Sequence, residues 1–344
     1  MDLTPAMSWS PPDSWQRVVV VDAHTGGEPF RVVVEGLPEI PGDTVLERRS
    51  HAQAHLDHFR KALMWEPRGH ADMYGGLIGP PASEDGDISV LFMHNEGFST
   101  MCGHGIIALA KVVLDTGILP ASEPETTLRI DTPAGRVAAT SVVRGGKVTQ
   151  TRFRNVPSFS AEIDASLEVP GLGKLRYDLG FGGAFYALVD VAEIGLDLDD
   201  PASLIAAGRI IKQEISATRS IEHPEHPDLG FLYGVIFTGP ARDSTHHSRN
   251  VCVFADGEVD RSPTGTGVSA RLAVMAARGE IALGDSVVVE SLVGSTFTGR
   301  IVETVELAGR AAVIPEIEGS AHITGRAELW LDPEDELGLG FLVR

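Results

Sequence analysis

The sequence predicts an α+β protein built from two pseudo-symmetric domains, each a curved, mostly antiparallel sheet around one central helix. Three observations support this prediction. With 344 residues, the chain exceeds the size that one hydrophobic core usually organises. Residues 106–114 are apolar nearly all round, as in a buried helix, and a second such stretch ends at Arg278. The strands and turns around the first stretch recur in the same order around the second, which indicates a duplicated module.

Composition limits the classes of partner. Hydrophobic residues make up 43% of the chain and charged residues 22%, as in ordinary globular proteins. The 48 acidic and 28 basic residues give a net charge of -20, which argues against nucleic acid or an anionic membrane as a partner. Two cysteines cannot form a disulfide framework, and neither a secretory leader nor a membrane-spanning run is evident. We therefore expect a cytoplasmic protein.

The first half of the chain begins with residues 1–15, a tail whose proline and serine content predicts disorder. Arg17–Asp22 is a β-branched strand, a glycine pair forms the turn after it, and Phe30–Val34 returns as the second strand of a hairpin. We place the first domain at 16–168. Its further expected elements are a helix over 43–63, strands over 72–76 and 88–93, and a hairpin of 127–135 and 136–143.

The second half repeats this order. A glycine turn at Gly183 again precedes an aromatic strand, and the interval from this turn to Thr264 is close to the interval from the first turn to Cys102. The second domain is expected at 169–324, and residues 325–344 are expected to return and complete the first domain. Two such modules would place Cys102 and Thr264 opposite each other in a cleft between the domains, which is a favoured place for a small-molecule site.

A cysteine stands where a loop becomes the first buried helix, in the motif Met-Cys-Gly-His-Gly at Met101–Gly105. The free amide N–H groups and the dipole at a helix start bind anions and lower the pKa of a cysteine there. Cys102 is therefore expected to be a reactive thiolate beside a carboxylate cradle. The competing interpretation is a small buried hydrophobic residue. Cys252, in the apolar alternation of a strand, fits that description and is expected in the core.

Four motifs resemble those of the proline racemase superfamily and cover, in order, nearly the whole chain after the tail. They are Asp22–Pro29, Glu66–Gly75, Met101–Gly105 and Asp260–Gly267. The superfamily includes proline racemases, 4-hydroxyproline epimerases and trans-3-hydroxy-L-proline dehydratases, all without an organic cofactor or a metal. The resemblance implies a fold like that of diaminopimelate epimerase and a hydroxylated proline as substrate. Such enzymes are often dimers, so a homodimer is expected, although no exposed apolar stripe marks an interface.

One position departs from the racemases and epimerases of this superfamily. Their second motif reads Ser-Pro-Cys-Gly-Thr-Gly, whereas Thr264 occupies the cysteine position here. Inversion at Cα needs a base on one face and an acid on the other, and a thiol can do either job. A threonine hydroxyl is too weakly acidic unless a partner activates it, and no partner is evident from the sequence. Thr264 is therefore expected to hydrogen bond, which resembles the Cys/Thr pattern of the trans-3-hydroxy-L-proline dehydratases.

The resemblance thus implies a lyase with one base. Cys102 would accept the α-proton of trans-3-hydroxy-L-proline, the 3-hydroxyl would leave as water, and the enamine would tautomerise to Δ1-pyrroline-2-carboxylate. The group that protonates the leaving oxygen stays open between Thr264, His104 and water. The alternative is a 4-hydroxyproline epimerase or a proline racemase with a modified second acid or base.

The other site residues divide by role. The substrate carboxylate is expected on backbone amides at the two helix starts, which would also stabilise the enolate-like transition state. Asp260 is expected to bind the ring ammonium, as the family's matching aspartate does. Tyr74 and Phe254 match aromatic positions that line the family's pocket. The helix-start residues concerned are Gly103, His104, Gly265 and Thr266.

A metal enzyme is a rival from another mechanistic class. His51, His55 and His58 stand at helical spacing, so one face of the helix expected over 43–63 could present all three to zinc or nickel. Against this, the same helix carries several arginines and a lysine, which is typical of a solvated face. We therefore expect no metal. Further imidazoles stand at His223, His226, His246 and His247.

Two other interpretations are weaker. The pattern Gly265-x-Gly267-x-x-Ala270 fits a dinucleotide fingerprint, but the βαβ frame that such a site needs is missing. A non-catalytic binder of proline analogues would keep the carboxylate cradle without turnover. Without the resemblance, Asp260 would be an ordinary turn residue and His104 a packing residue at a helix start.

Overall fold

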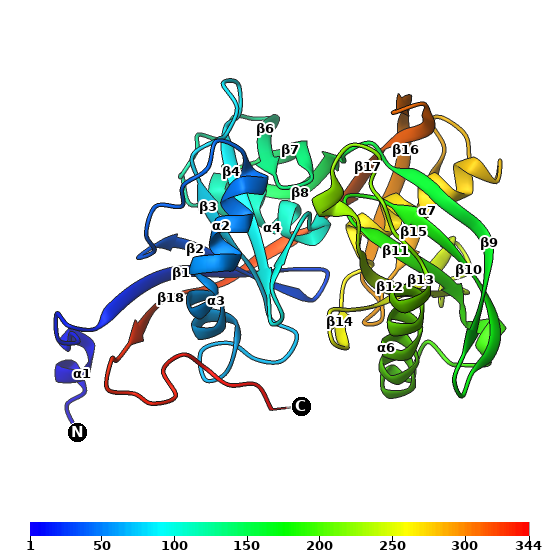
Figure 1. Cartoon of the computed structure of the whole chain (residues 1–344). Helices are drawn as coiled ribbons and strands as arrows, with labels where there is room; N and C mark the ends of the chain where they lie inside the picture. The colour runs from blue at the N-terminus through cyan, green and yellow to red at the C-terminus, as the bar shows by residue number, and fades with distance from the viewer. Residues whose placement is uncertain (344) are drawn as a thin grey trace.

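The computed structural model describes residues 1–343 and shows two lobes side by side (Figure 1). Each lobe wraps its strands around one buried helix, α4 (Gly103–Asp115) in the first and α7 (Gly265–Ala277) in the second. A short helix, α1 (Thr4–Ser8), precedes the first lobe. The first lobe contains β1 (Gln16–Thr25), β2 (Glu28–Glu35), α2 (Val45–His55), α3 (Asp57–Met64), β3 (Tyr74–Gly79), β4 (Ile88–His94), β5 (Phe98–Ser99), β6 (Glu125–Thr132), β7 (Gly135–Arg144), β8 (Lys147–Arg154) and β18 (Ala321–Leu331).

The second lobe runs from green to orange in Figure 1. It contains β9 (Phe159–Val169), β10 (Gly173–Phe181), β11 (Phe185–Asp190), α5 (Val191–Ile194), α6 (Pro201–Thr218), a 3-10 turn at Pro227–Leu229, β12 (Leu232–Gly239), β13 (Ser248–Phe254), β14 (Glu258–Asp260), β15 (Ser286–Glu290), β16 (Thr296–Leu307) and β17 (Arg310–Gly319).

Strand pairing follows the same order in both lobes. In each lobe, the second strand of a hairpin pairs in parallel with the next strand of the chain, β2 with β3 and β11 with β12. The strand before the buried helix pairs in parallel with the strand after it, β4 with β6 and β13 with β15. The other pairings are antiparallel, and β8 with β17 joins the lobes. The predicted α+β class, with a mostly antiparallel sheet around a central helix in each half, is confirmed.

Strand pairing at β9 and β18 bears on where the two halves divide. β9 pairs with β10 along most of its length, so residues 159–168 belong to the second lobe rather than to the first. β18 pairs with β1 from Gln16 to Thr25, which places the C-terminal strand in the first lobe. We therefore propose a domain division within 155–158, in place of a boundary at 168.

The N-terminal segment holds more structure than its composition suggests. Trp9 packs edge-on against Trp15 and Trp330, with ring centroids 6.0 and 5.2 Å away. These contacts fasten the segment 1–15 to the edge formed by β1 and β18, which accounts for the difference from the expected disorder. Among the helices of residues 1–343, none combines the length and apolar character needed to cross a bilayer.

The helix expected over 43–63 is interrupted at Leu56, which is buried between α2 and α3. His58 therefore lies on a different helix from His51 and His55, and its ring packs at a tilt against the neighbouring phenylalanine. The three imidazoles do not share one helix face. Within the described part of the chain, no group of three or more His, Cys, Asp or Glu side chains is arranged to hold a metal ion.

The two buried helices meet at their N-termini. A Cβ atom on Gly103 would lie 2.6 Å from Cα of Gly265, so the absence of a side chain is what lets the two backbones approach this closely. Each helix start carries amide N–H groups without intrahelical partners and the positive end of a dipole. Two such ends therefore converge between the lobes, as the internal repeat predicted.

Candidate active site

A closed cavity of about 10 Å³ lies where the two helices meet. Such a volume holds about one water molecule, so the lobes are closed on each other. The residues that the sequence singled out for catalysis or binding all line this cavity. They are Tyr74, Cys102, Gly103 and His104 from the first lobe, and Phe254, Asp260, Thr264, Gly265 and Thr266 from the second.

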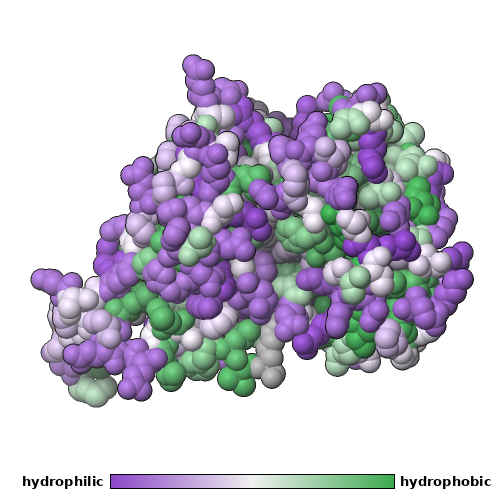
Figure 2. All heavy atoms as spheres, in the orientation of Figure 1, coloured by the Kyte–Doolittle hydropathy of each residue, from purple (hydrophilic) through white to green (hydrophobic). Residues whose placement is uncertain are grey.

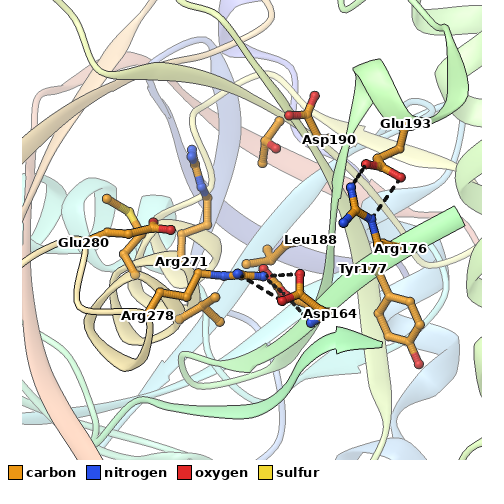
Figure 3. Close-up of a pocket in the computed structure, with 13 residues that line it drawn as sticks. Asp164, Arg176, Tyr177, Leu188, Asp190, Glu193, Arg271, Arg278 and Glu280 are labelled. Carbon is orange, nitrogen blue, oxygen red and sulfur yellow. Dashed lines mark hydrogen bonds and ion pairs between the residues drawn. The ribbon is translucent and has the colours of Figure 1, made fainter. Parts of the chain in front are cut away.

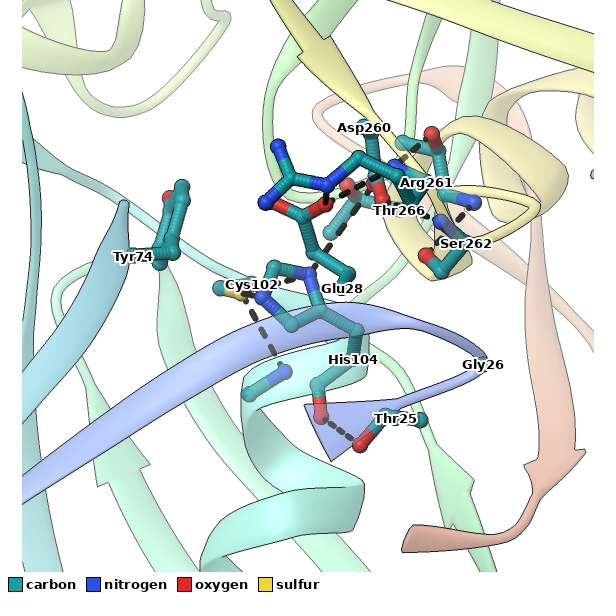
Figure 4. Close-up of polar contacts among 12 residues, drawn as sticks. Thr25, Gly26, Glu28, Tyr74, Cys102, His104, Asp260, Arg261, Ser262 and Thr266 are labelled. Carbon is teal, nitrogen blue, oxygen red and sulfur yellow. Dashed lines mark hydrogen bonds and ion pairs between the residues drawn. The ribbon is translucent and has the colours of Figure 1, made fainter. Parts of the chain in front are cut away.

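Cys102 is the N-cap residue of α4. Its backbone is extended, and its Sγ accepts a hydrogen bond from the Gly105 N–H over 3.2 Å. Sγ also lies 3.3 Å from Nδ1 of His104 (Figure 4). The sulfur takes the place that a serine or aspartate oxygen usually occupies in a cap, so it sits at the positive end of the helix dipole and faces the cavity.

The pKa of Cys102 departs from the expectation based on the helix start. Burial raises the pKa of the thiol well above its ordinary value, and the Asp260 and Glu28 carboxylates add to the increase. The Gly105 N–H opposes these effects without overcoming them. The prediction of a lowered pKa is therefore wrong for the closed lobes, where the group is a thiol. A cation placed beside the sulfur would shift the balance toward the thiolate.

His104 is held neutral beside the sulfur. Burial lowers the pKa of its imidazole to about 4, and only 4% of the residue is exposed. The rings of Phe30 and Tyr74 meet it edge-on, with centroids 5.9 and 4.9 Å away. A neutral imidazole donates from one nitrogen and accepts at the other, so His104 can hydrogen bond to the sulfur or to a ligand without adding charge.

The Thr264 hydroxyl has a partner that was not evident from the sequence. It donates to Oδ2 of Asp260 over 2.9 Å, while Oδ1 of Asp260 accepts from the Ser262 N–H over 2.7 Å. Thr264 has a φ of 66°, a conformation that β-branched residues rarely adopt. Because the hydroxyl proton is engaged with a carboxylate, Thr264 and Asp260 both present acceptor lone pairs to the cavity.

Four residues that line the cavity were not among the predicted site residues: Met101, Tyr186, Tyr233 and Cys252. Cys252 is buried, as expected, but it also borders the cavity because it pairs with Asp260 across β13 and β14. The Tyr186 hydroxyl lies 2.7 Å from Oγ1 of Thr266. The internal repeat held the signal for Tyr233, which stands near the start of β12 as Tyr74 does at the start of β3.

A buried ion pair joins the lobes beside the cavity (Figure 4). Glu28, fully buried at the start of β2, accepts from the backbone N–H and the Nε of Arg261 over 2.8 and 3.0 Å. Burial raises the pKa of Glu28 and the nearby Asp260 carboxylate adds to the increase, while Arg261 opposes both. The pair fastens the hairpin of the first lobe to the loop that carries Asp260. The glutamate stands in the motif Asp22–Pro29 but was not singled out.

A larger cavity, of about 270 Å³, lies against α7 in the second lobe (Figure 3). None of the predicted site residues lines it among the described residues. Its charged side chains largely neutralise one another: Arg278 bonds Asp164 and Asp178, and Arg176 bonds Glu193. We therefore assign the chemistry to the small cavity between the helix starts.

Fold and site together define a class: two-lobed α+β proteins with a small cavity between two helix N-termini. The family model for proline racemase matches residues 20–342. The chain therefore belongs to the proline racemase family, which confirms the resemblance seen in its motifs.

Its relatives carry two different activities in their names. A trans-3-hydroxy-L-proline dehydratase of Burkholderia cenocepacia is 46% identical over 94% of this chain and 97% of its own length. A 3-hydroxyproline 2-epimerase of Burkholderia multivorans matches with the same identity and coverage. The crystal structure of a hydroxyproline epimerase from Agrobacterium vitis, with bound trans-4-hydroxy-L-proline, matches with a TM-score of 0.91 at 34% identity and covers 96% of each chain.

Proposed function

We propose that this chain is a trans-3-hydroxy-L-proline dehydratase, a hydro-lyase that forms Δ1-pyrroline-2-carboxylate and water. The observation that carries the proposal is the asymmetry between the two faces of the cavity. Cys102 offers a sulfur that can take a proton, whereas Thr264, at the mirrored helix start, is bonded to Asp260 and offers lone pairs. The dehydratase name of the Burkholderia cenocepacia relative supports the same activity.

The cavity supplies a partner for each charged group of the substrate. The carboxylate is placed on the backbone amides of the first turns of α4 and α7, where N–H groups lack intrahelical partners and both dipoles favour an anion. The ring ammonium is placed on Asp260, because that carboxylate and the Thr264 oxygen both accept hydrogen bonds. Tyr74 and Phe254, with ring centroids 6.0 Å apart, cover the ring and exclude water.

Substrate binding prepares the base. An ammonium on Asp260 lies close to the Cys102 sulfur, because Asp260 is itself near enough to raise the pKa of the thiol. The added positive charge cancels that effect and favours the thiolate. The developing negative charge on the carboxylate oxygens is then stabilised by the two helix starts.

The stereochemistry of the substrate lets one group perform both proton transfers. In trans-3-hydroxy-L-proline the hydroxyl lies on the ring face opposite the carboxylate, so the α-proton and the hydroxyl share a face. The Cys102 thiolate takes the α-proton, the electrons of that bond form the double bond between Cα and C3, and the C3–O bond breaks. The new thiol gives its proton to the leaving oxygen, which departs as water. The enamine then tautomerises to Δ1-pyrroline-2-carboxylate.

The second candidate is a 3-hydroxyproline 2-epimerase, an activity that the name of the Burkholderia multivorans relative favours. Inversion requires a proton donor on the ring face opposite Cys102. Thr264 stands at that face, but its proton is engaged with Asp260. Epimerisation is therefore expected to be a minor activity beside dehydration.

A panel of substrates tests the proposal. Purified protein is incubated with L-proline, cis- and trans-4-hydroxyproline and trans-3-hydroxy-L-proline, and the pyrroline product is detected with o-aminobenzaldehyde. We expect product from trans-3-hydroxy-L-proline alone. Optical-rotation change with proline or 4-hydroxyproline, without any pyrroline, would contradict dehydration and support a racemase or an epimerase.

The proposed reaction also bears on cofactors, location and assembly. Its steps are complete with one thiol and the substrate's own leaving group, so we propose that neither a metal nor an organic cofactor takes part. Cys102 and Cys252 are both unbridged thiols, and a catalytic thiol is preserved in a reducing compartment, so we place the enzyme in the cytoplasm. A homodimer stays a prediction.

A further inference from the structure

A cavity of about 300 Å³ opens between the lobes, next to the closed active-site cavity. Side chains from α2 of the first lobe and α6 of the second contribute to its walls. Figure 2 shows the surface hollowed between the lobes on the face that carries these two helices. We call this cavity the interlobe cleft. The lining residues that matter here are Arg49, Gln53, Glu96, Ser99, Lys212, Tyr233 and Asp256.

A pair of tyrosines separates the interlobe cleft from the active-site cavity. Tyr233 lines both cavities, and Tyr74 lines the inner one. Their hydroxyl oxygens, one from each lobe, are 3.0 Å apart. Ser99, which lines the cleft, hydrogen bonds to the Tyr74 hydroxyl. Because the tyrosine pair bridges the two lobes, separation of the lobes breaks it and opens the inner cavity toward the cleft.

The interlobe cleft carries charges of both signs. Arg49 and Lys212, on opposite lobes, each donate to a backbone carbonyl, over 2.8 and 2.7 Å. Burial lowers the pKa of both side chains, as happens when a cation is held partly away from water. The carboxylates of Glu96 and Asp256 line the same cleft, and Asp256 is also paired with Arg209 over 2.9 Å. Cations and anions together suit a zwitterion, whereas a simple anion would be repelled by the carboxylates.

We propose that the interlobe cleft is the port that admits a zwitterionic amino acid and holds it until the Tyr74–Tyr233 pair opens. The ligand's carboxylate faces Arg49 and Lys212, and its ammonium faces Glu96. The identity of the ligand rests on the proposed function, but the route does not. A zwitterion carries no net charge, so the protein's net charge of -20 does not repel it at long range, and the local cations and anions at the port provide the recognition.

A competing opening lies beside the turn between β1 and β2. That cavity, of about 460 Å³, includes His24 and Gln150 in its lining and, among the described residues, shares no lining residue with the active-site cavity. The turn is also fastened to the second lobe, because the Ser295 hydroxyl donates to the Gly26 carbonyl over 2.7 Å. The structure therefore favours the interlobe cleft as the route.

Plugging each opening in turn tests the route. Gln53→Cys places a thiol in the interlobe cleft and Gln150→Cys places one in the competing cavity, while the native Cys102 and Cys252 are buried. Each variant is treated with a bulky maleimide, with the wild type treated in parallel, and kcat/KM is measured before and after. Labelled Gln53→Cys is expected to lose about tenfold or more, and labelled Gln150→Cys less than about twofold, because a plug acts only on the path that substrate uses.

The outcomes separate the route from the proposed function. Slowing of labelled Gln150→Cys with unimpaired labelled Gln53→Cys would overturn the proposal, and so would equal rates in the two labelled variants. Turnover of the unlabelled wild type tests the proposed function on its own. The plug comparison then uses whichever proline analogue of the panel the wild type converts.

Charge variants test the class of ligand. The double variant Arg49→Gln, Lys212→Gln is expected to lose about tenfold in kcat/KM at low salt while kcat stays within about twofold, and the loss should shrink at high salt. Lys174→Gln, an exposed position on β10 outside the cleft, is the matched control and is expected to leave both constants unchanged. An unchanged kcat/KM in the double variant would contradict capture of a zwitterion.

Discussion

The hydroxyl of Thr264 donates its proton to Oδ2 of Asp260 across 2.9 Å, at the helix start that mirrors the one capped by Cys102. This hydrogen bond distinguishes the two faces of a nearly symmetric site. In the proposed reaction the face of Cys102 exchanges a proton with the substrate, whereas the Thr264 hydroxyl donates its proton to a carboxylate. The difference in reaction between relatives of one fold is therefore expected to depend on this position.

Thr264→Cys should introduce a second thiol opposite Cys102 and with it some racemase activity. The nearby Asp260 carboxylate keeps the pKa of such a thiol high, so the new activity is expected to be well below the dehydration rate of the parent. Deuterated D-proline formed from L-proline in D₂O is the signal, because deuterium with inversion requires a donor on the second face. D-proline in the parent at the same rate would contradict the assignment, and Thr264→Ser serves as the matched control.

Cys102→Ser and Cys102→Ala should both reduce turnover by about a thousandfold or more, the upper part of the range for a lost general base. Serine keeps a cap for the Gly105 N–H, so Cys102→Ser should keep the free energy of unfolding, whereas Cys102→Ala should lose about 1 kcal/mol. Pyrroline formation and urea unfolding measure the two effects. Cys252→Ala, the other buried cysteine beside the cavity, is the control and should lose less than about tenfold. Appreciable turnover in Cys102→Ser would remove the thiolate from its role.

The pH dependence of the reaction should report the buried thiol. Burial raises the pKa of Cys102 well above its ordinary value, and a base works only when deprotonated, so kcat/KM should rise with pH through the alkaline range. The rise of kcat with pH should occur at lower pH than the rise of kcat/KM, because the ammonium of the bound substrate favours the thiolate. Rates at low substrate between about pH 6 and 10 give the pH dependence of kcat/KM, and rates at saturating substrate give that of kcat. A kcat/KM that is flat over this range would be incompatible with a thiol of raised pKa.

Sequence patterns predicted the site better than its electrostatics. Motif and repeat placed Cys102 and Thr264 at mirrored helix starts, because local glycine and apolar patterns determine where a buried helix begins. The pKa of Cys102 is raised first by burial and then by the Asp260 and Glu28 carboxylates. Both effects come from segments far from Cys102 in the sequence, so no local pattern predicts them. The hydrogen bond from Thr264 to Asp260 likewise required the loop conformation, with its φ of 66°.

The same limits apply to the fold. Alternation and turns revealed the hairpins, but the sequence alone did not show that β9 pairs with β10, which is the observation behind the domain division proposed here. The break at Leu56 was missed because a buried leucine fits a continuous helix as well as an interrupted one. Tyr233 could have been found by aligning the two halves on Tyr74, so a repeat holds information about the lining of a cavity as well as about the fold.

His104 should make the stability of the protein depend on pH. Burial lowers the pKa of its imidazole to about 4 in the folded state, below the value of about 6.5 in an unfolded chain, so the unfolded state binds more protons between these values. The free energy of unfolding should therefore fall as the pH drops from 6.5 toward 4, by about 2 kcal/mol between pH 7.5 and 5. Urea unfolding at the two pH values measures this decrease in the free energy of unfolding. His104→Gln should remove this pH-dependent part of the free energy of unfolding, whereas the exposed His55→Gln should keep it. Equal slopes of the free energy of unfolding against pH in the wild type and both variants would contradict a buried neutral His104.

Gly103→Ala should hold the two helix starts apart. The added Cβ would meet Cα and C of Gly265 and N of Thr266 at 2.6 to 3.0 Å, and all three are backbone atoms of the opposite lobe that cannot rotate away. Restoring ordinary contact separates the lobes by on the order of 1 Å, a displacement that can reduce a rate by about a hundredfold because both the carboxylate cradle and the base move relative to the substrate.

The free energy of unfolding should also fall by about 1 to 3 kcal/mol, as in other overpacked contacts. Gly325→Ala is the matched control, since a Cβ there meets nothing within 4 Å and its backbone is not left-handed. Pyrroline formation and urea unfolding of the two variants measure the comparison. If Gly103→Ala turned over substrate as fast as Gly325→Ala, contact between the helix starts would not be needed for catalysis, and the carboxylate cradle would have to be built by other groups.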